Sequence, residues 1–508
     1  MSQTSNNKRI AKNTLMLYFR MILIMAVTLY SSRVILEVLG VEDYGTFNVV
    51  GGVITTLSFI TGSLGGATSR FLTFELGKGN SENVEKVFRT ANTIYYAFSA
   101  IFLIIAETVG LWFVNTYLEI PEGREIAVQF VYQCSVITFI ISIISIPYNA
   151  LIIAQEHMNA FAYISIYEAI AKLAILFILP AIGGDSLIWY SILLMLVQVS
   201  VRIIYNVYCN KQFKESTMRW LWDKELIKSM FSYSWWTMNG YLAMVGYTQG
   251  LNILLNIFFG PVVNAARAIS VQVQSALEEF FGNIPMAIKP QAIKQYAQGN
   301  LEYMHVLVLK AGRISFLMSI LVAIPLLMYT EYIMNLWLVN PPEHTVTFVR
   351  LMLIAGISGS LKQHTIMSIH ATGDIKKFQI YEGSFLLLIV PIGYCLAKFF
   401  NASPEAIILS YVIIEILSEF LRVLLVYPKI DLKIKFFFSK VLNKCFAVLG
   451  ILSIPTYLMY KYAQPDNFIS FLILTLSVVI IEIIAIYIVG LEQDEKAQVK
   501  LILKKIRR

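Results

Sequence analysis

Apolar residues occur along the chain in continuous runs separated by short polar segments. Each run reaches roughly 20 residues, which is enough for a helix to cross a bilayer core of about 30 Å. The runs lack the strict alternation of barrel strands, so they predict membrane-spanning helices in an all-α membrane protein. The expected spans, about 14 in all, are 14–39, 45–72, 86–115, 124–152, 157–182, 186–208, 228–258, 261–289, 304–338, 345–371, 376–398, 404–427, 438–460 and 468–489.

Two features of the sequence affect how these spans are assigned. Pro147 and Pro325 lie inside expected helices, where a missing backbone N–H can interrupt the helix. The first apolar stretch follows Lys8, Arg9 and Lys12 but continues to Leu39, which is too long for a cleavable signal peptide. It is therefore expected to be the first span.

Basic residues mark one side of the membrane. With a cytoplasmic N-terminus, the outer loops hold only Arg124, Lys398 and Lys461, and almost all other loop lysines and arginines lie inside. The net charge of +8 then reflects membrane topology, and nucleic acid is not an expected partner. Both termini are expected in the cytoplasm, which requires an even number of spans.

The chain contains a faint internal repeat. A shift of about 220 residues pairs Gly40 with Gly260, Gly79-Asn80 with Gly299-Asn300, and spans 1–4 with spans 7–10. Copies of six spans have the same orientation, as in transporters built from two parallel lobes. The expected organisation is an N-lobe (1–208), an amphipathic cytoplasmic linker (209–227), a C-lobe (228–428), and two further spans with a basic cytoplasmic tail (429–508). The alternative for the linker is a solvated connector.

Three segments resemble a known family. NTLMLYFRMILIMAVTLYSSRVILEVLGVEDYGTFNVVGGV, SLGGATSRFLTFELGKGN and IPYNALIIAQEHMNAFAYISIYE are similar to bacterial flippases for O-antigen and capsule repeat units. Those flippases belong to the multidrug/oligosaccharidyl-lipid/polysaccharide exporter superfamily. The resemblance implies movement of undecaprenyl-diphosphate-linked oligosaccharide from the cytoplasmic to the periplasmic leaflet by alternating access.

The same resemblance implies a place in the cell. The expected location is the bacterial cytoplasmic (inner) membrane, with a role in polysaccharide and lipopolysaccharide biosynthesis. The implied partners are the polyprenyl-diphosphate lipid, membrane lipids, a glycan polymerase and a chain-length regulator. No cofactor is implied.

Charged residues inside spans are costly in hydrocarbon and are therefore the candidate site residues. Arg20 and Arg33 lie in span 1, Arg70 in span 2 and Arg267 in span 8. Related lipid II flippases carry arginines in these spans, and the planar guanidinium suits a diphosphate. The alternative is that arginines near span ends extend to the membrane surface.

Further candidates lie in other spans. Glu168 and Lys172 are one helical turn apart, so they form either a structural ion pair or part of a cavity. Lys172 and Lys362 are candidate phosphate ligands, and Glu168 and Glu278 are candidate ion-coupling residues.

Two other features of the spans have different interpretations. Glu415, Glu419 and Arg422 have the spacing of a self-contained network on one helix. Glu482 in the last span has no partner within its helix and no explanation from the sequence.

The chain shows no signature of an enzyme. The outer loops are short, and there is no nucleophile–base pair, metal-ligand cluster or glycine-rich phosphate loop. The four cysteines are widely spaced and resemble small buried apolar residues. The alternatives to a flippase are a cation-coupled drug or small-molecule antiporter and, less favoured, a membrane glycan polymerase or ligase.

Overall fold

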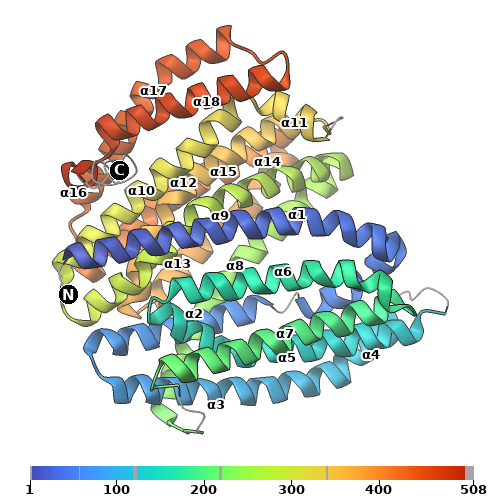
Figure 1. Cartoon of the computed structure of the whole chain (residues 1–508). Helices are drawn as coiled ribbons and strands as arrows, with labels where there is room; N and C mark the ends of the chain where they lie inside the picture. Colours follow the sequence, from blue (N-terminus) through green and yellow to red (C-terminus); the bar gives the residue numbers. More distant parts are fainter. Residues whose placement is uncertain (1–2, 56–57, 118–122, 217–219, 339–340, 498–508) are drawn as a thin grey trace, which may run out of the picture. The chain divides into compact units, whose positions relative to one another are not determined.

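The fold is helical throughout the part of the chain that the structure describes. The computed structural model describes residues 3–55, 58–117, 123–216, 220–338 and 341–497, and all regular elements there are helices (Figure 1). Within these ranges, eleven helical segments are long and apolar enough to cross a membrane. The prediction of an all-α membrane protein is confirmed, and the number of 14 spans stays a prediction.

Three expected spans are not among those eleven segments: 45–72, 261–289 and 404–427. The last two are helical nonetheless, as α9 (Pro261–Ala297) and α15 (Pro404–Val426). Both carry several ionisable residues, which lower their hydropathy without breaking the helix. Two of these ionisable residues, Arg267 and Glu278 on α9, are candidate site residues.

Contacts divide the chain into two compact units. The first comprises Met1–Met238 and Ile293–Gly299. Its α5 packs against α7, α2 and α3, and α1 packs against α6. The elements are α1 (Gln3–Thr55), α2 (Ser58–Lys78), α3 (Ser81–Ile105), η1 (Ala106–Gly110), α4 (Leu111–Tyr117), α5 (Glu125–Ala154), α6 (Met158–Ile182), α7 (Ser186–Gln212) and the start of α8 (Lys224–Phe259).

The second unit comprises Asn239–Ala292 and Asn300–Arg508. Its α12 packs against α10 and α15, and the final pair α17 and α18 packs against α10 (Figure 1). Besides α9 and α15, its elements are α10 (Leu301–Met328), α11 (Thr330–Leu338), α12 (Thr345–Thr372), α13 (Lys376–Leu387), α14 (Ile389–Phe400), η2 (Tyr427–Ile430), α16 (Ile434–Phe436), η3 (Phe437–Leu442), α17 (Asn443–Tyr462), α18 (Phe468–Ala485) and η4 (Ile486–Gly490).

A glycine divides the first long helix. Gly40 has φ 77° and ψ 168°, a conformation open to glycine but not to residues with a Cβ. The chain therefore changes direction within α1, and the expected span 45–72 is divided between α1 and α2, with residues 56–57 outside the described ranges. Gly260, the repeat partner of Gly40, has φ 82° and directly precedes α9.

Other pairs of the repeat also share local geometry. Gly79 and Gly299 have φ 73° and 74°. Asn80 and Asn300 follow them, and each side chain accepts a hydrogen bond from the backbone amide three residues later, at 3.0 and 3.3 Å. Each asparagine thus caps the next helix, α3 or α10. The paired positions share conformation and capping as well as residue type.

The two prolines behave differently. α5 continues through Pro147 to Ala154. By contrast, α10 ends at Met328, three residues after Pro325, and α11 begins at Thr330. The expected span 304–338 therefore contains a break, whereas 124–152 does not.

Candidate functional site

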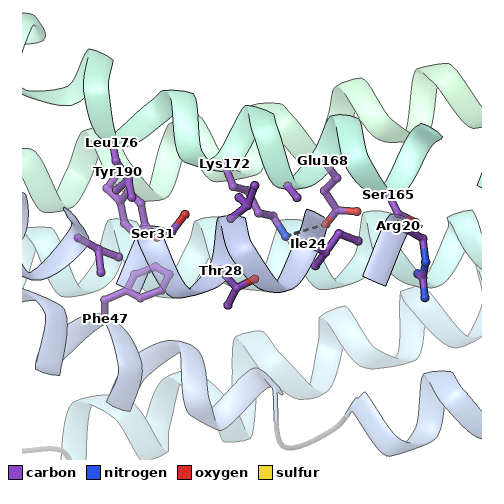
Figure 2. Close-up of a pocket in the computed structure, with 13 residues that line it drawn as sticks. Arg20, Ile24, Thr28, Ser31, Phe47, Ser165, Glu168, Lys172, Leu176 and Tyr190 are labelled. Atoms are coloured by element: carbon purple, nitrogen blue, oxygen red, sulfur yellow. Dashed lines mark hydrogen bonds and ion pairs between the residues drawn. The ribbon is translucent and has the colours of Figure 1, made fainter. Parts of the chain in front are cut away.

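The first unit contains a pocket of about 510 Å³ between α1 and α6, with Tyr190 contributed by α7 (Figure 2). Its charged residues are Arg20, Glu168 and Lys172. Hydroxyl groups of Thr28, Ser31, Ser165 and Tyr190 add polar surface. The remaining wall is apolar and includes Ile24, Phe47 and Leu176.

Helical spacing brings these side chains to one place. On α1, Arg20, Ile24, Thr28 and Ser31 follow one another at intervals of three or four residues. On α6, the same intervals separate Ser165, Glu168 and Lys172. Residues with this spacing share one face of a helix, and α1 packs against α6 along these faces.

The pocket has an excess of positive charge. Lys172 Nζ lies 2.6 Å from Glu168 Oε1, and their side chains are 47% and 30% exposed. The ion pair expected from the sequence is confirmed, and it lies in the pocket wall. The Arg20 guanidinium lies 4.7 Å from the centre of the Phe161 ring, a cation–π contact. Arg20 and Lys172 together outweigh Glu168, leaving one net positive charge.

Two other arginines of the first unit have different positions. Arg70 on α2 is buried and lies 4.8 to 5.7 Å from the ring centres of Phe71, Phe74 and Tyr233. It does not line the pocket. Arg33 belongs to α1, but its side chain lies outside the part that the structure describes.

Arg267 is the buried arginine of α9 in the second unit. It is 2% exposed, and its Nε donates to Asn252 Oδ1 at 2.6 Å. Nη2 donates to the Thr248 carbonyl at 3.3 Å. In the described part of the unit, Nη1 is buried and has no hydrogen-bond partner. The guanidinium thus retains an unused donor.

Glu278 and Lys362 meet elsewhere in this unit. Lys362 Nζ lies 3.4 Å from Glu278 Oε2. Gln274 Nε2 donates to Glu278 Oε1 at 3.0 Å and to the Tyr411 hydroxyl at 3.4 Å. The two candidates from the sequence therefore form an ion pair with additional polar support from α9 and α15.

Arg422 lies at the centre of a buried acidic cluster. Its Nε is 2.6 Å from Glu382 Oε1, Nη2 is 3.4 Å from Glu415 Oε2, and Nη1 pairs with Glu419 Oε1. The network expected among Glu415, Glu419 and Arg422 is confirmed, but it is not self-contained, because Glu382 on α13 also pairs with Arg422. Oε2 of Glu419 is buried and has no partner among the described residues.

This cluster and the Glu278 pair together contain more acids than bases. Lys362 also interacts electrostatically with Glu415, which connects the two groups. Their carboxylates are Glu278, Glu382, Glu415 and Glu419, and their cations are Lys362 and Arg422. We refer to these six residues as the acidic network. If all six were ionised, two negative charges would remain uncompensated.

The comparisons with known proteins now assign the chain to a family. A sequence model described as "Polysaccharide biosynthesis protein" matches residues 10–291, more than half of the chain. The chain belongs to this polysaccharide biosynthesis protein family. No curated protein matches it.

Solved structures show the same fold. A multidrug resistance MATE family transporter of the MOP superfamily, in an outward-facing conformation, has TM-score 0.74 and 13% identity, covering 84% of this chain and 96% of its own. A MATE in the bent conformation matches with TM-score 0.74, 14% identity and the same coverage.

A third similar structure is a MOP superfamily transporter from Pyrococcus furiosus. It has TM-score 0.71 and 13% identity over 84% of this chain and 96% of its own, and is described by the reverse polarity of its binding pocket. The family and these neighbours are transporters rather than enzymes. The resemblance is confirmed at the level of the superfamily, and the protein is a multi-pass membrane transporter.

Several residues of the site were not predicted from the sequence. Thr28 and Ser31 could have been found, because they follow Arg20 at helical spacing. Glu382 is 40 positions from Arg422, and no local pattern connects the two. Likewise Tyr190 reaches the pocket from α7 only through tertiary packing.

Proposed function

We propose that this transporter is a flippase for an oligosaccharide linked through diphosphate to a polyprenyl lipid. The observation that carries the proposal is the cationic pocket of the first unit, where Arg20 and Lys172 lie beside four hydroxyl-bearing side chains. A diphosphate offers several anionic oxygens to these cations. The hydroxyl groups can exchange hydrogen bonds with the sugar that is attached to the diphosphate.

The size of the pocket supports the same substrate. A volume of about 510 Å³ lies within the range of roughly 300–1,000 Å³ that is usual for small-molecule sites. That space suits the headgroup and an adjoining sugar. The polyprenyl tail would remain in the bilayer, because an apolar chain is stable in hydrocarbon.

We infer that the Glu168–Lys172 pair takes part in the transport cycle. Glu168 Oε1 lies 2.6 Å from Lys172 Nζ. An incoming phosphate must therefore displace this carboxylate or share the ammonium group with it. A displaced Glu168 becomes a site for a proton or another cation. The acidic network of the second unit, which includes Glu278, offers a second coupling site, since its excess negative charge favours a bound cation.

The other proposed substrate ligands differ in their support. Arg267 is the best supported, because its buried Nη1 has no partner in the described part of the chain. Lys362 is neutralised by Glu278, and Arg70 is enclosed by aromatic rings. Arg33 stays a proposal from the sequence alone.

The proposed cycle is alternating access in the bacterial inner membrane, with both termini in the cytoplasm and transport toward the periplasmic leaflet. A glycan polymerase and a chain-length regulator would then act on the product. O-antigen or capsule repeat units are the proposed class of substrate. The membrane potential or an ion gradient would supply the driving force.

Transport in proteoliposomes tests the proposal. A short-chain lipid-diphosphate oligosaccharide is added, and its movement between leaflets is followed for wild type, Arg20→Ala, Lys172→Ala and a control, Lys398→Ala. Lys398 is on α14 of the second unit and does not line the pocket. We expect at least a tenfold loss of rate for the two pocket variants and none for the control. Wild-type rates in both pocket variants would refute the proposal.

Drug antiport is the second candidate function. It is favoured by the acidic network and by the similarity in fold to the multidrug resistance MATE structure. The same proteoliposomes distinguish the two functions. Efflux of a cationic dye that requires the network carboxylates, without movement of the lipid, would establish the antiporter instead.

A further inference from the structure

Glu482 on α18 lies outside both the pocket and the acidic network. Its side chain is 0% exposed, and in the described part of the chain neither carboxylate oxygen has a hydrogen-bond partner. α18 contains no other ionisable residue. An isolated carboxyl group is thus buried in an apolar helix, and neither transport proposal uses it.

Two contacts define what surrounds Glu482. One turn earlier, Val478 belongs to a buried cluster with Met328 and Tyr329 at the end of α10. Beyond Glu482, a Cβ on Gly490 would lie 3.1 Å from Leu317 on α10 and 3.3 Å from Val448 on α17. Glu482 therefore lies between these contacts, in the packing of α18 against α10 and α17.

The facing stretches carry almost no ionisable groups. Residues 317–328 of α10 have none, and residues 448–459 of α17 have only Tyr457, which is exposed. Beyond these stretches, Arg313 and Lys310 on α10 bind Glu495 at 2.7 and 3.5 Å, and Arg313 also binds Glu492. The other charged or titratable groups near the ends of the packed elements are Glu302, Tyr303 and His305 on α10, Lys444, Cys445, Tyr460, Lys461 and Tyr462 on α17, Lys440 on η3 and Tyr487 on η4.

An ionised Glu482 would be expensive in this position. A buried carboxylate without a counter-charge or hydrogen bonds costs many kcal/mol, and such groups take up a proton instead. A protonated carboxyl group also gains an O–H donor.

We propose that Glu482 is a proton-binding site that stabilises the packing of α17 and α18 on α10 in this conformation. The proton leaves only when α18 moves enough to admit water. A π-helical turn, η4, begins four residues after Glu482, and such turns are points where a helix can change its winding. The contact between α18 and α10 is therefore proton-dependent, whatever substrate the transporter carries.

Infrared spectroscopy and thermal unfolding test the site in the full-length protein. Glu482→Gln keeps the size and neutrality of the protonated side chain, and Glu331→Gln, at an exposed position of α11, is the matched control. At neutral pH, we expect the carbonyl-stretch absorption of protonated carboxyl groups in wild type and Glu331→Gln to contain one component that Glu482→Gln lacks. Equal absorption in all three proteins would overturn the proposal.

The pH dependence of unfolding gives the second readout. As pH rises into the alkaline range, the wild-type midpoint should fall more steeply than that of Glu482→Gln, because only the carboxyl group can lose a proton. Glu331→Gln should follow wild type. Parallel profiles for wild type and Glu482→Gln would also overturn the proposal. If Glu482→Gln does not fold, loss of the wild-type band at alkaline pH, with a shifted band in Glu482→Asp, decides the question.

Discussion

Replacing Arg422 by methionine would remove the cation that three buried carboxylates share. The guanidinium is 2% exposed and contacts Glu382, Glu415 and Glu419. Methionine keeps much of the apolar stem and adds no charge. The variant therefore isolates the electrostatic role of Arg422 in the second unit.

The expected cost follows from the burial of its partners. Removing one member of a buried ion pair typically costs about 3–5 kcal/mol, because the remaining charge is left without compensation. Three carboxylates lose their cation here, but each can bind a proton at a cost of about 1.4 kcal/mol per pH unit. We therefore expect a loss of about 3–5 kcal/mol at pH 7 that becomes smaller at pH 5.

Thermal unfolding in detergent, followed by intrinsic fluorescence, measures this loss. Arg422→Met should unfold at a clearly lower temperature, and Arg422→Met combined with Glu419→Leu should recover part of the difference. Lys398→Leu at the surface serves as the control and should change stability by less than about 0.5 kcal/mol. A loss below about 1 kcal/mol for Arg422→Met, as for an exposed pair, would refute the electrostatic interpretation.

Three further predictions concern stability, again measured by thermal unfolding. A Cβ at Gly77 would lie 2.8 Å from backbone near the end of α9, so Gly77→Ala should cost about 1–3 kcal/mol, and an unchanged midpoint would contradict this. Asn80→Ala and Asn300→Ala should each cost about 1 kcal/mol through the lost caps, and clearly unequal losses would count against equivalent roles in the repeat. Burial raises the pKa of Glu492, but the hydrogen bond from Arg313, together with the positive charges of Arg313, Lys440 and Lys444, outweighs this and leaves the pKa below its ordinary value. The carboxylate therefore stabilises the protein at neutral pH and loses this effect as pH falls, so Glu492→Gln should be less stable at pH 7 and less sensitive to acid than wild type.

The helices were predictable from the sequence because hydrocarbon leaves the backbone few alternatives. Continuous apolar runs identified both α5 and α18. The bend in α1 was harder to predict, since Gly40 could have been packed within a straight helix. Its positive φ is a consequence of the fold, and only the pairing with Gly260 gave it significance in the sequence.

The site was predictable only where its residues are neighbours on one helix. Glu168 and Lys172 are four positions apart, so their ion pair followed from helix geometry. Arg20 joins them because α1 packs against α6, which no local pattern encodes. The same limit applies to Glu382 and Arg422, whose contact depends on the packing of α13 against α15.

The two units carry opposite excess charges within a similar local framework. The same glycine turns and asparagine caps recur in both, yet the pocket of the first unit is positive and the network of the second is negative. The glycine and asparagine positions of the repeat determine where helices end and bend. The charged residues on the helix faces are at other positions, so they can differ between the two units. Charged side chains inside a membrane are costly, and they mark candidate sites for ligands of the opposite sign. The proposed flippase uses both sets of charges: its anionic headgroup would meet Arg20 and Lys172 in the first unit, and a coupling cation or proton would meet the carboxylates of the second.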